Sequence, residues 1–119
     1  MRVLLADDEP KVRAALRLIL EQLKEVEYIE EVTDTEGLVK RLDSSLPSPD
    51  LVLVDWELPG LHPGGTFLEL RRRAPFKMIV LSGRCPAPQA AISAGADACL
   101  SKCEPPDRLF ATLHEMGAD

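Results

Sequence analysis

Five short apolar runs recur along this chain of 119 residues, and segments with helical periodicity separate them. The runs cover residues 2–6, 28–33, 51–55, 77–81 and 98–101. Strict alternation of strands and helices predicts right-handed βαβ units and therefore a parallel sheet. Five units cannot close an eight-stranded barrel. We therefore predict an α/β fold with an open, doubly wound, five-stranded parallel sheet of order 2-1-3-4-5 and helices on both faces.

The central run, Leu51 to Val54, is apolar at every position, as expected of a strand buried on both faces, whereas run 28–33 is half polar, as expected of an edge. The first helix is expected to start at Pro10, the second to follow a cap within 33–36, and the third to end before Pro75. A fourth helix is expected from about Ala87 to Ala94, with Gly95 as its C-cap, and a last one after a cap at Asp107.

Composition favours one globular domain spanning residues 1–119, either complete or the N-terminal part of a longer protein. The net charge of -6 argues against direct binding of nucleic acid. The basic run Arg71 to Arg73 suits a helix end with a solvated face. No apolar run approaches the ~18 residues of a membrane helix, so no membrane is expected. Three cysteines and no signal peptide favour a reducing cytoplasm.

Polar side chains stand where the predicted strands end. Asp7 and Asp8 follow the first strand, Asp55 ends the third, and Ser82 and Lys102 follow the fourth and fifth. The carboxyl ends of parallel strands share one edge, and order 2-1-3-4-5 puts its switch point between strands 1 and 3. We therefore expect these side chains to meet in one cleft.

Three carboxylates in one cleft repel, each pair by roughly 4 kcal/mol at ~4 Å and an effective dielectric of 20. Lys102 supplies one positive charge, so a divalent cation is expected as well. Oxygen ligands favour Mg²⁺, with Mn²⁺ as a substitute. Such a site suits attack by Asp55 on a phosphoryl group, with Lys102 and Ser82 stabilising the phosphoryl oxygens.

This set of residues resembles the receiver domain of bacterial response regulators. The resemblance rests on the acidic pair Asp7-Asp8, Asp55 followed by Leu58-Pro59-Gly60, and then Ser82 and Lys102, and it covers nearly the whole chain. It implies a flavodoxin-like fold and a role in a two-component phosphorelay. It also implies a signalling domain rather than an enzyme, limited to self-catalysed phosphorylation and dephosphorylation.

The resemblance assigns a role to each residue of the cleft. Asp55 is the expected phosphoacceptor from a sensor histidine kinase. Asp8 is the expected direct Mg²⁺ ligand, Asp7 is expected to assist through water, and the backbone carbonyl of Glu57 is expected to complete the metal shell.

The same resemblance makes Ser82 and Lys102 phosphate sensors. Receivers usually carry Tyr or Phe at the switch position three residues before the lysine, where this chain has Cys99. A proline usually follows the lysine, where this chain has Cys103. The chain is further similar to receivers fused to a C-terminal helix-turn-helix output domain, which implies transcriptional control. Whether a homodimer forms is left open.

Two other functions stay open at this point. The chain could be an interaction module that is never phosphorylated, since the switch aromatic is missing at Cys99. It could also be a phosphatase that forms an aspartyl phosphate, although such enzymes carry the nucleophile after the first strand. Cys99 and Cys103 could form half of a metal or redox site, but buried free thiols are common. Trp56 is expected near the rim of the cleft.

Overall fold

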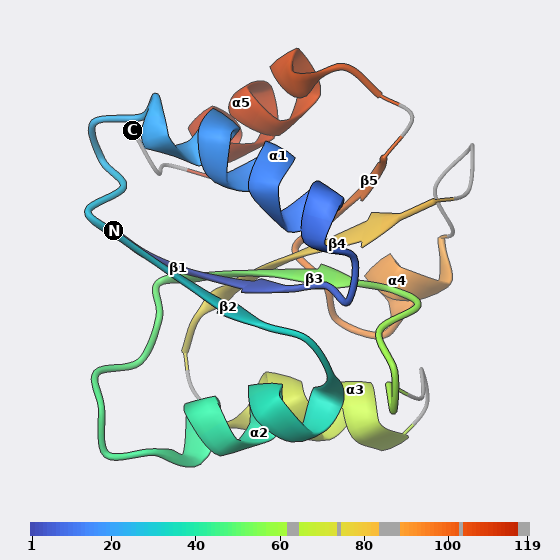
Figure 1. Ribbon diagram of the computed structural model, residues 1–119. Coiled ribbons are helices and arrows are strands. Elements are labelled where there is room, and N and C mark those ends of the chain that lie inside the picture. The colour runs from blue at the N-terminus through green and yellow to red at the C-terminus, as the bar shows by residue number, and fades with distance from the viewer. Residues whose placement is uncertain (62–64, 74, 84–88, 103, 117–119) are drawn as a thin grey trace.

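The computed structural model describes residues 1–61, 65–73, 75–83, 89–102 and 104–116 and shows the predicted five-stranded sheet (Figure 1). The strands pair in parallel in the order β2-β1-β3-β4-β5. The elements are β1 (Arg2–Ala6), α1 (Pro10–Glu21), β2 (Tyr28–Val32), α2 (Thr35–Asp43), β3 (Leu51–Asp55), α3 (Gly65–Arg72), β4 (Lys77–Ser82), α4 (Ala90–Ser93), β5 (Ala98–Ser101) and α5 (Pro106–Glu115).

Helices cover both faces of the sheet, as predicted. Figure 1 shows α1 and α5 on one face and α2 and α3 on the other. The side chains of β3 alternate between the two layers, because successive residues of a strand point to opposite faces. Val52 and Val54 join the apolar cluster under α2, α3 and α4, while Leu51 and Leu53 join the cluster under α1 and α5. All five residues of β3 are buried.

The register of the sheet brings the strand ends to one edge. Ala6 at the end of β1 pairs with Val54, so that the residues following β1 lie beside Asp55. Ser82 at the end of β4 pairs with Ser101 at the end of β5. The segments that carry the predicted site residues therefore meet at the carboxyl edge. No helix within the described ranges is long and apolar enough to cross a membrane.

Local capping agrees with the sequence in part. Asp34 caps α2 as predicted, since its Oδ1 accepts a hydrogen bond of 2.7 Å from the backbone N–H of Gly37. The predicted cap at Asp107 is wrong. Helix α5 begins at Pro106, whose fixed φ suits a first helical position, and Asp107 lies inside the first turn.

The fourth helix is described for Ala90–Ser93, and the predicted start near Ala87 lies outside the described residues. Gly95 follows it with φ of 114°, the left-handed conformation expected of a C-cap glycine.

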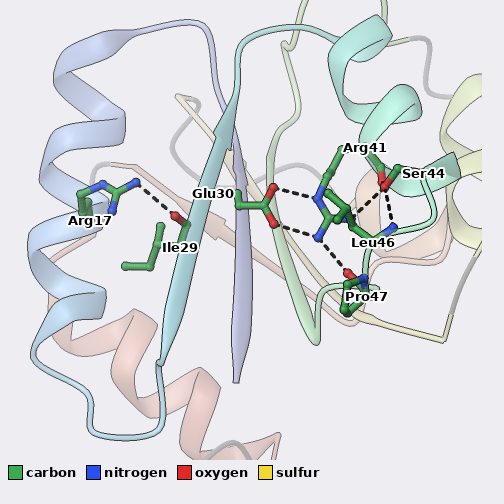
Figure 2. Close-up of polar contacts among 7 residues, drawn as sticks. All are labelled: Arg17, Ile29, Glu30, Arg41, Ser44, Leu46 and Pro47. Atoms are coloured by element: carbon green, nitrogen blue, oxygen red, sulfur yellow. Dashed lines mark hydrogen bonds and ion pairs between the residues drawn. The ribbon is translucent and has the colours of Figure 1, made fainter.

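Strand β2 is an edge strand, and charged side chains flank it on both faces (Figure 2). On the α2 side, Glu30 accepts two hydrogen bonds from Arg41, of 2.7 and 2.8 Å, and Arg41 also donates to the carbonyl oxygen of Pro47. On the α1 side, Arg17 donates to the carbonyl oxygen of Ile29 at 3.3 Å. Charged groups at an edge discourage pairing with a further strand.

Arg71 ties α3 to the amino edge of the sheet. Its guanidinium donates to the carbonyl oxygens of Phe76 at 2.6 Å and Gly95 at 3.0 Å, and to Oδ2 of Asp97 at 3.1 Å. The same Asp97 oxygen accepts the backbone N–H of Met78 at 2.7 Å. The side chain of Arg71 is 28% exposed, so it keeps part of the predicted solvated face, and its planar fork also finds backbone acceptors that only the folded chain brings together.

We expect Arg71→Ala to lower the free energy of unfolding by about 2 kcal/mol, because charged hydrogen bonds to the backbone carbonyls of Phe76 and Gly95 are lost. Arg72→Ala is the matched control, since its side chain is exposed and should change stability by less than about 0.5 kcal/mol. Urea unfolding followed by circular dichroism measures both. Equal stability of the two variants would contradict this account of Arg71.

Candidate functional site

Asp7 is the first polar residue after β1, and its carboxylate is almost fully buried at 2% exposure. Its backbone N–H donates to the carbonyl oxygen of Val32, which continues the pairing of β1 with β2. Oδ1 accepts the backbone N–H of Glu9 at 2.8 Å, and Oδ2 accepts a hydrogen bond of 2.7 Å from Nζ of Lys102. Asp8, the next residue, is exposed.

Asp55 ends β3 with its carboxylate buried at 5% exposure. Oδ1 accepts the backbone N–H of Glu57 at 3.0 Å, and Oδ2 lies 3.5 Å from Nζ of Lys102. Burial raises the pKa of Asp55 and the charge of Asp7 adds to the rise, while Glu57 and Lys102 partly oppose it. The ionised form of Asp55 is therefore destabilised in the folded protein.

Lys102 provides the positive charge between these two carboxylates. Its backbone N–H donates to the carbonyl oxygen of Ser82 at 2.7 Å, which places it directly beyond the end of β4. Burial lowers the pKa of Lys102, but the hydrogen bond to Asp7 and the charge of Asp55 outweigh it, and the pKa is raised overall. The ammonium group is therefore charged at neutral pH.

The three carboxylates can share one cation. Asp7, Asp8 and Asp55 each offer an oxygen, and these oxygens lie within 4.8 Å of one another. Such hard, anionic oxygen donors fit Mg²⁺, which also keeps several waters when bound. One lysine does not balance three negative charges, so a divalent ion would complete the site electrically.

The remaining predicted residues lie close to this cluster. Ser82 is fully buried at the end of β4. Cys99 is half-buried on β5, where it packs against the apolar cluster on the α2, α3 and α4 side. Burial raises the pKa of the Cys99 thiol, and the charge of Glu104 raises it further. Cys99 is a free thiol, and Cys103 lies outside the described residues.

Trp56 lies deeper than expected. It is 7% exposed and belongs to the apolar cluster under α2, α3 and α4, and its backbone N–H donates to the carbonyl oxygen of Leu81 at 2.8 Å. Its predicted place on the rim is therefore wrong. The indole packs on the same side as Val52 and Val54, because residue 56 continues their alternation along the chain.

Arg13 is a residue of this neighbourhood that the sequence did not single out. Its Nη1 donates to the backbone carbonyl of Asp7 at 2.7 Å, and its Nε donates to Glu31 on β2 at 2.8 Å. The sequence feature that could have pointed to Arg13 is its position in the first turn of the helix that follows the acidic pair. A cation placed there also reduces the negative potential around Asp7.

Fold and site define a class of α/β domain with a flavodoxin-like sheet and an acidic cluster with one lysine at its switch point. The chain belongs to the response regulator receiver domain family, which matches residues 3–114.

Curated relatives and solved structures agree with this assignment. Response regulator UvrY of Escherichia coli K12 is 33% identical over 123 residues, covering 98% of this chain and 54% of UvrY. This chain thus spans about half the length of that relative. RcsB from Salmonella enterica serovar Typhimurium, solved bound to a promoter with the phosphomimetic BeF3-, superposes with a TM-score of 0.83 at 26% identity, covering 98% of this chain and 67% of RcsB.

A third comparison shows the fold. The receiver domain of the sensor histidine kinase PA1611 from Pseudomonas aeruginosa, solved with magnesium coordinated in its active-site cleft, superposes with a TM-score of 0.78 at 20% identity. The match covers 98% of this chain and 97% of the PA1611 domain.

The raised pKa of Asp55 predicts a pH-dependent stability difference between wild type and Asp55→Asn. A carboxyl group whose pKa is higher in the folded protein than in the unfolded chain makes the protein less stable as the pH rises from the unfolded-state pKa through the folded-state pKa. Without divalent ions, we expect Asp55→Asn to be more stable than the wild type at pH 7, because the amide carries no charge that burial would destabilise. The difference should shrink as pH falls towards about 4, where unfolded aspartate becomes protonated.

Denaturant unfolding at several pH values in the presence of a chelator measures this difference. Glu115→Gln, which changes an exposed carboxylate on α5, is the control and should show a small, pH-independent effect. A wild type that equals or exceeds Asp55→Asn in stability at pH 7 would show that burial does not dominate the energetics of Asp55.

Proposed function

We propose that this domain is the phosphoacceptor of a two-component phosphorelay and that Asp55 receives a phosphoryl group from a phosphohistidine of a sensor kinase. The observation that carries the proposal is the buried Asp55 carboxylate, which lies 3.5 Å from Nζ of Lys102 within a cluster of three acids. Membership of the receiver family supports it.

The chain's own groups prepare Asp55 for this reaction. The N–H of Glu57 holds one carboxylate oxygen, so the other oxygen faces Lys102. In the transfer, an Asp55 oxygen forms a bond to phosphorus while the bond from phosphorus to the donor imidazole nitrogen breaks, and the imidazole leaves with its electron pair. Lys102 lies within reach to offset negative charge on the phosphoryl oxygens.

A divalent ion completes the proposed site. Asp8 and Asp55 would hold Mg²⁺ directly, Asp7 would assist through water, and the backbone carbonyl of Glu57 would supply a further oxygen. When bound, the ion would neutralise charge on the transferring phosphoryl group. The oxygen donors of the three carboxylates support this assignment, and the magnesium seen in the related PA1611 domain is consistent with it.

Ser82 and Lys102 are proposed to sense the phosphoryl group, because both lie at strand ends next to Asp55. Cys99 occupies the proposed switch position on β5, which β4 separates from the strand of Asp55. Its side chain is small and half-buried against the core. We therefore propose that the response spreads through the backbone of β4 and β5 rather than through the rotation of an aromatic ring at this position.

An apolar groove of about 380 Å³ between α1 and α5 is the proposed docking surface for the kinase. Its lining includes Val12, Leu16 and Leu109, and Lys102 lies at its edge, so a partner helix seated there would be close to Asp55. The output is proposed to be transcriptional, since RcsB was solved on promoter DNA. With a net charge of -6, the domain itself is not expected to bind DNA.

Incubation with Mg²⁺ and a small phosphodonor should add one acid-labile phosphoryl group to the wild-type protein, detected by intact mass. Asp55→Asn should take up none, because the nucleophilic oxygen is replaced by an amide. Asp107→Asn, an exposed carboxylate of α5, should react like wild type. Unmodified wild type, or equal modification of Asp55→Asn, would sink the proposed function and favour an unphosphorylated interaction module.

Mg²⁺ binding should change the emission of Trp56, since the indole is buried immediately after Asp55. A titration should give a saturable change, and Asp8→Asn should raise the dissociation constant by about 10-fold or more through loss of an anionic ligand. Asp107→Asn again serves as the control. An unchanged dissociation constant for Asp8→Asn would remove Asp8 from the ligand set.

A further inference from the structure

The backbone around Lys102 is held from two sides. Strand β5 is the last strand of the sheet, so one of its edges pairs with β4 and the other faces away. The N–H of Lys102 points to β4, where it meets the carbonyl oxygen of Ser82 at 2.7 Å. Adjacent N–H groups of a strand point in opposite directions. The N–H of Ser101 therefore points to the open edge.

Glu104 occupies that open edge. Its Oε1 accepts the N–H of Ser101 at 3.1 Å, and its own backbone N–H donates to the carbonyl oxygen of Ser101 at 3.0 Å. Both polar backbone groups of Ser101 thus bond to Glu104, on the far side of Lys102 in the sequence. The hydrogen bonds from Ser101 and then Arg108 hold the pKa of Glu104 below its usual range, so the side chain is anionic.

Arg108 fixes the Glu104 side chain from α5. Its Nε donates to Oε2 of Glu104 at 2.7 Å, while Oε1 remains on Ser101. One carboxylate therefore bridges the end of β5 and the first turn of α5. Without this bridge, the turn that carries Lys102 would keep the anchor from Ser82 and the backbone hydrogen bond between Glu104 and Ser101.

We propose that Glu104, held by Arg108, is a positioning residue for Lys102. By closing the turn after β5 on the backbone of Ser101, it restricts the flexible lysine side chain to the region of Asp7 and Asp55. The inference rests on the proposed function insofar as it concerns phosphoryl transfer to Asp55. A positioned charge acts at lower entropic cost in the transition state than a mobile one.

The first test is the rate at which a small phosphodonor modifies Asp55 in saturating Mg²⁺. We expect Glu104→Ala to react about 10-fold more slowly, because the turn that carries Lys102 loses the hydrogen bond between the Glu104 side chain and the N–H of Ser101 and positions the lysine less tightly. Glu104→Gln keeps an oxygen for the N–H of Ser101 and should recover most of the rate. Asp107→Ala, three residues further along, should match wild type. Equal rates for Glu104→Ala and wild type would overturn the proposal.

A double-mutant cycle with Lys102→Ala separates positioning from general destabilisation. If Glu104 acts through Lys102, Glu104→Ala should have little further effect on the rate in the Lys102→Ala background. A merely structural role would slow both backgrounds by the same factor. The same factor in both, with unchanged secondary structure by circular dichroism, would overturn the proposal even if Glu104→Ala alone were slow.

A readout without phosphoryl transfer keeps this proposal distinct from the proposed function. The side-chain ammonium resonance of Lys102, assigned by its loss in Lys102→Ala, should be protected from rapid exchange in the metal-free wild type by its ion pair with Asp7. It should broaden in Glu104→Ala and recover in Glu104→Gln. An unchanged resonance in Glu104→Ala would refute the positioning role, whereas failure of wild type to be phosphorylated would refute the proposed function.

Discussion

The ion pairs of Lys102 with Asp7 and Asp55 are the interaction on which the carboxyl edge of this domain depends. Two buried carboxylates at a switch point would repel each other strongly in a medium of low dielectric. Nζ lies 2.7 Å from one and 3.5 Å from the other, so a single ammonium group serves both. Removing Lys102 would leave two buried carboxylates without compensation, which costs more than the ion pairs contribute. The site therefore holds negative charge that one lysine does not fully compensate, and the chemistry open to it depends on that charge.

The sheet order creates this arrangement. Lys102 and Asp7 are 95 residues apart in the chain, yet β1 and β5 end at the same edge with β3 and β4 between them. The apolar β3 strand supplies the rigid base, because every one of its residues is buried. Asp55 is carried into the interior as the last residue of that strand. The desolvation that raises its pKa is thus a direct consequence of the strand that positions it.

Sequence pattern was enough for the fold and for the acidic cluster, because both follow from the positions of strands and of the residues at their ends. The contacts of Arg71, Arg13 and Glu104 were not predictable in this way. Each uses a long polar side chain to reach backbone atoms of another segment. Hydrophobic periodicity indicates which positions are buried, but it does not indicate which distant backbone atoms a long polar side chain will contact. The misplaced cap at Asp107 is a smaller case, in which the conformational preference of the adjacent proline decided the helix start.

The two edges of the sheet differ in how their charges are paired. At the amino edge, Arg71 and Asp97 satisfy backbone groups at the starts of β4 and β5, and no net charge is left between them. At the carboxyl edge, three acids face one lysine. The amino edge is thus held by hydrogen bonds between segments, whereas the carboxyl edge carries uncompensated negative charge. Glu104 and Ser82 hold the backbone beside this charge, so the position of Lys102 is set by backbone contacts that lie outside the charged cluster itself.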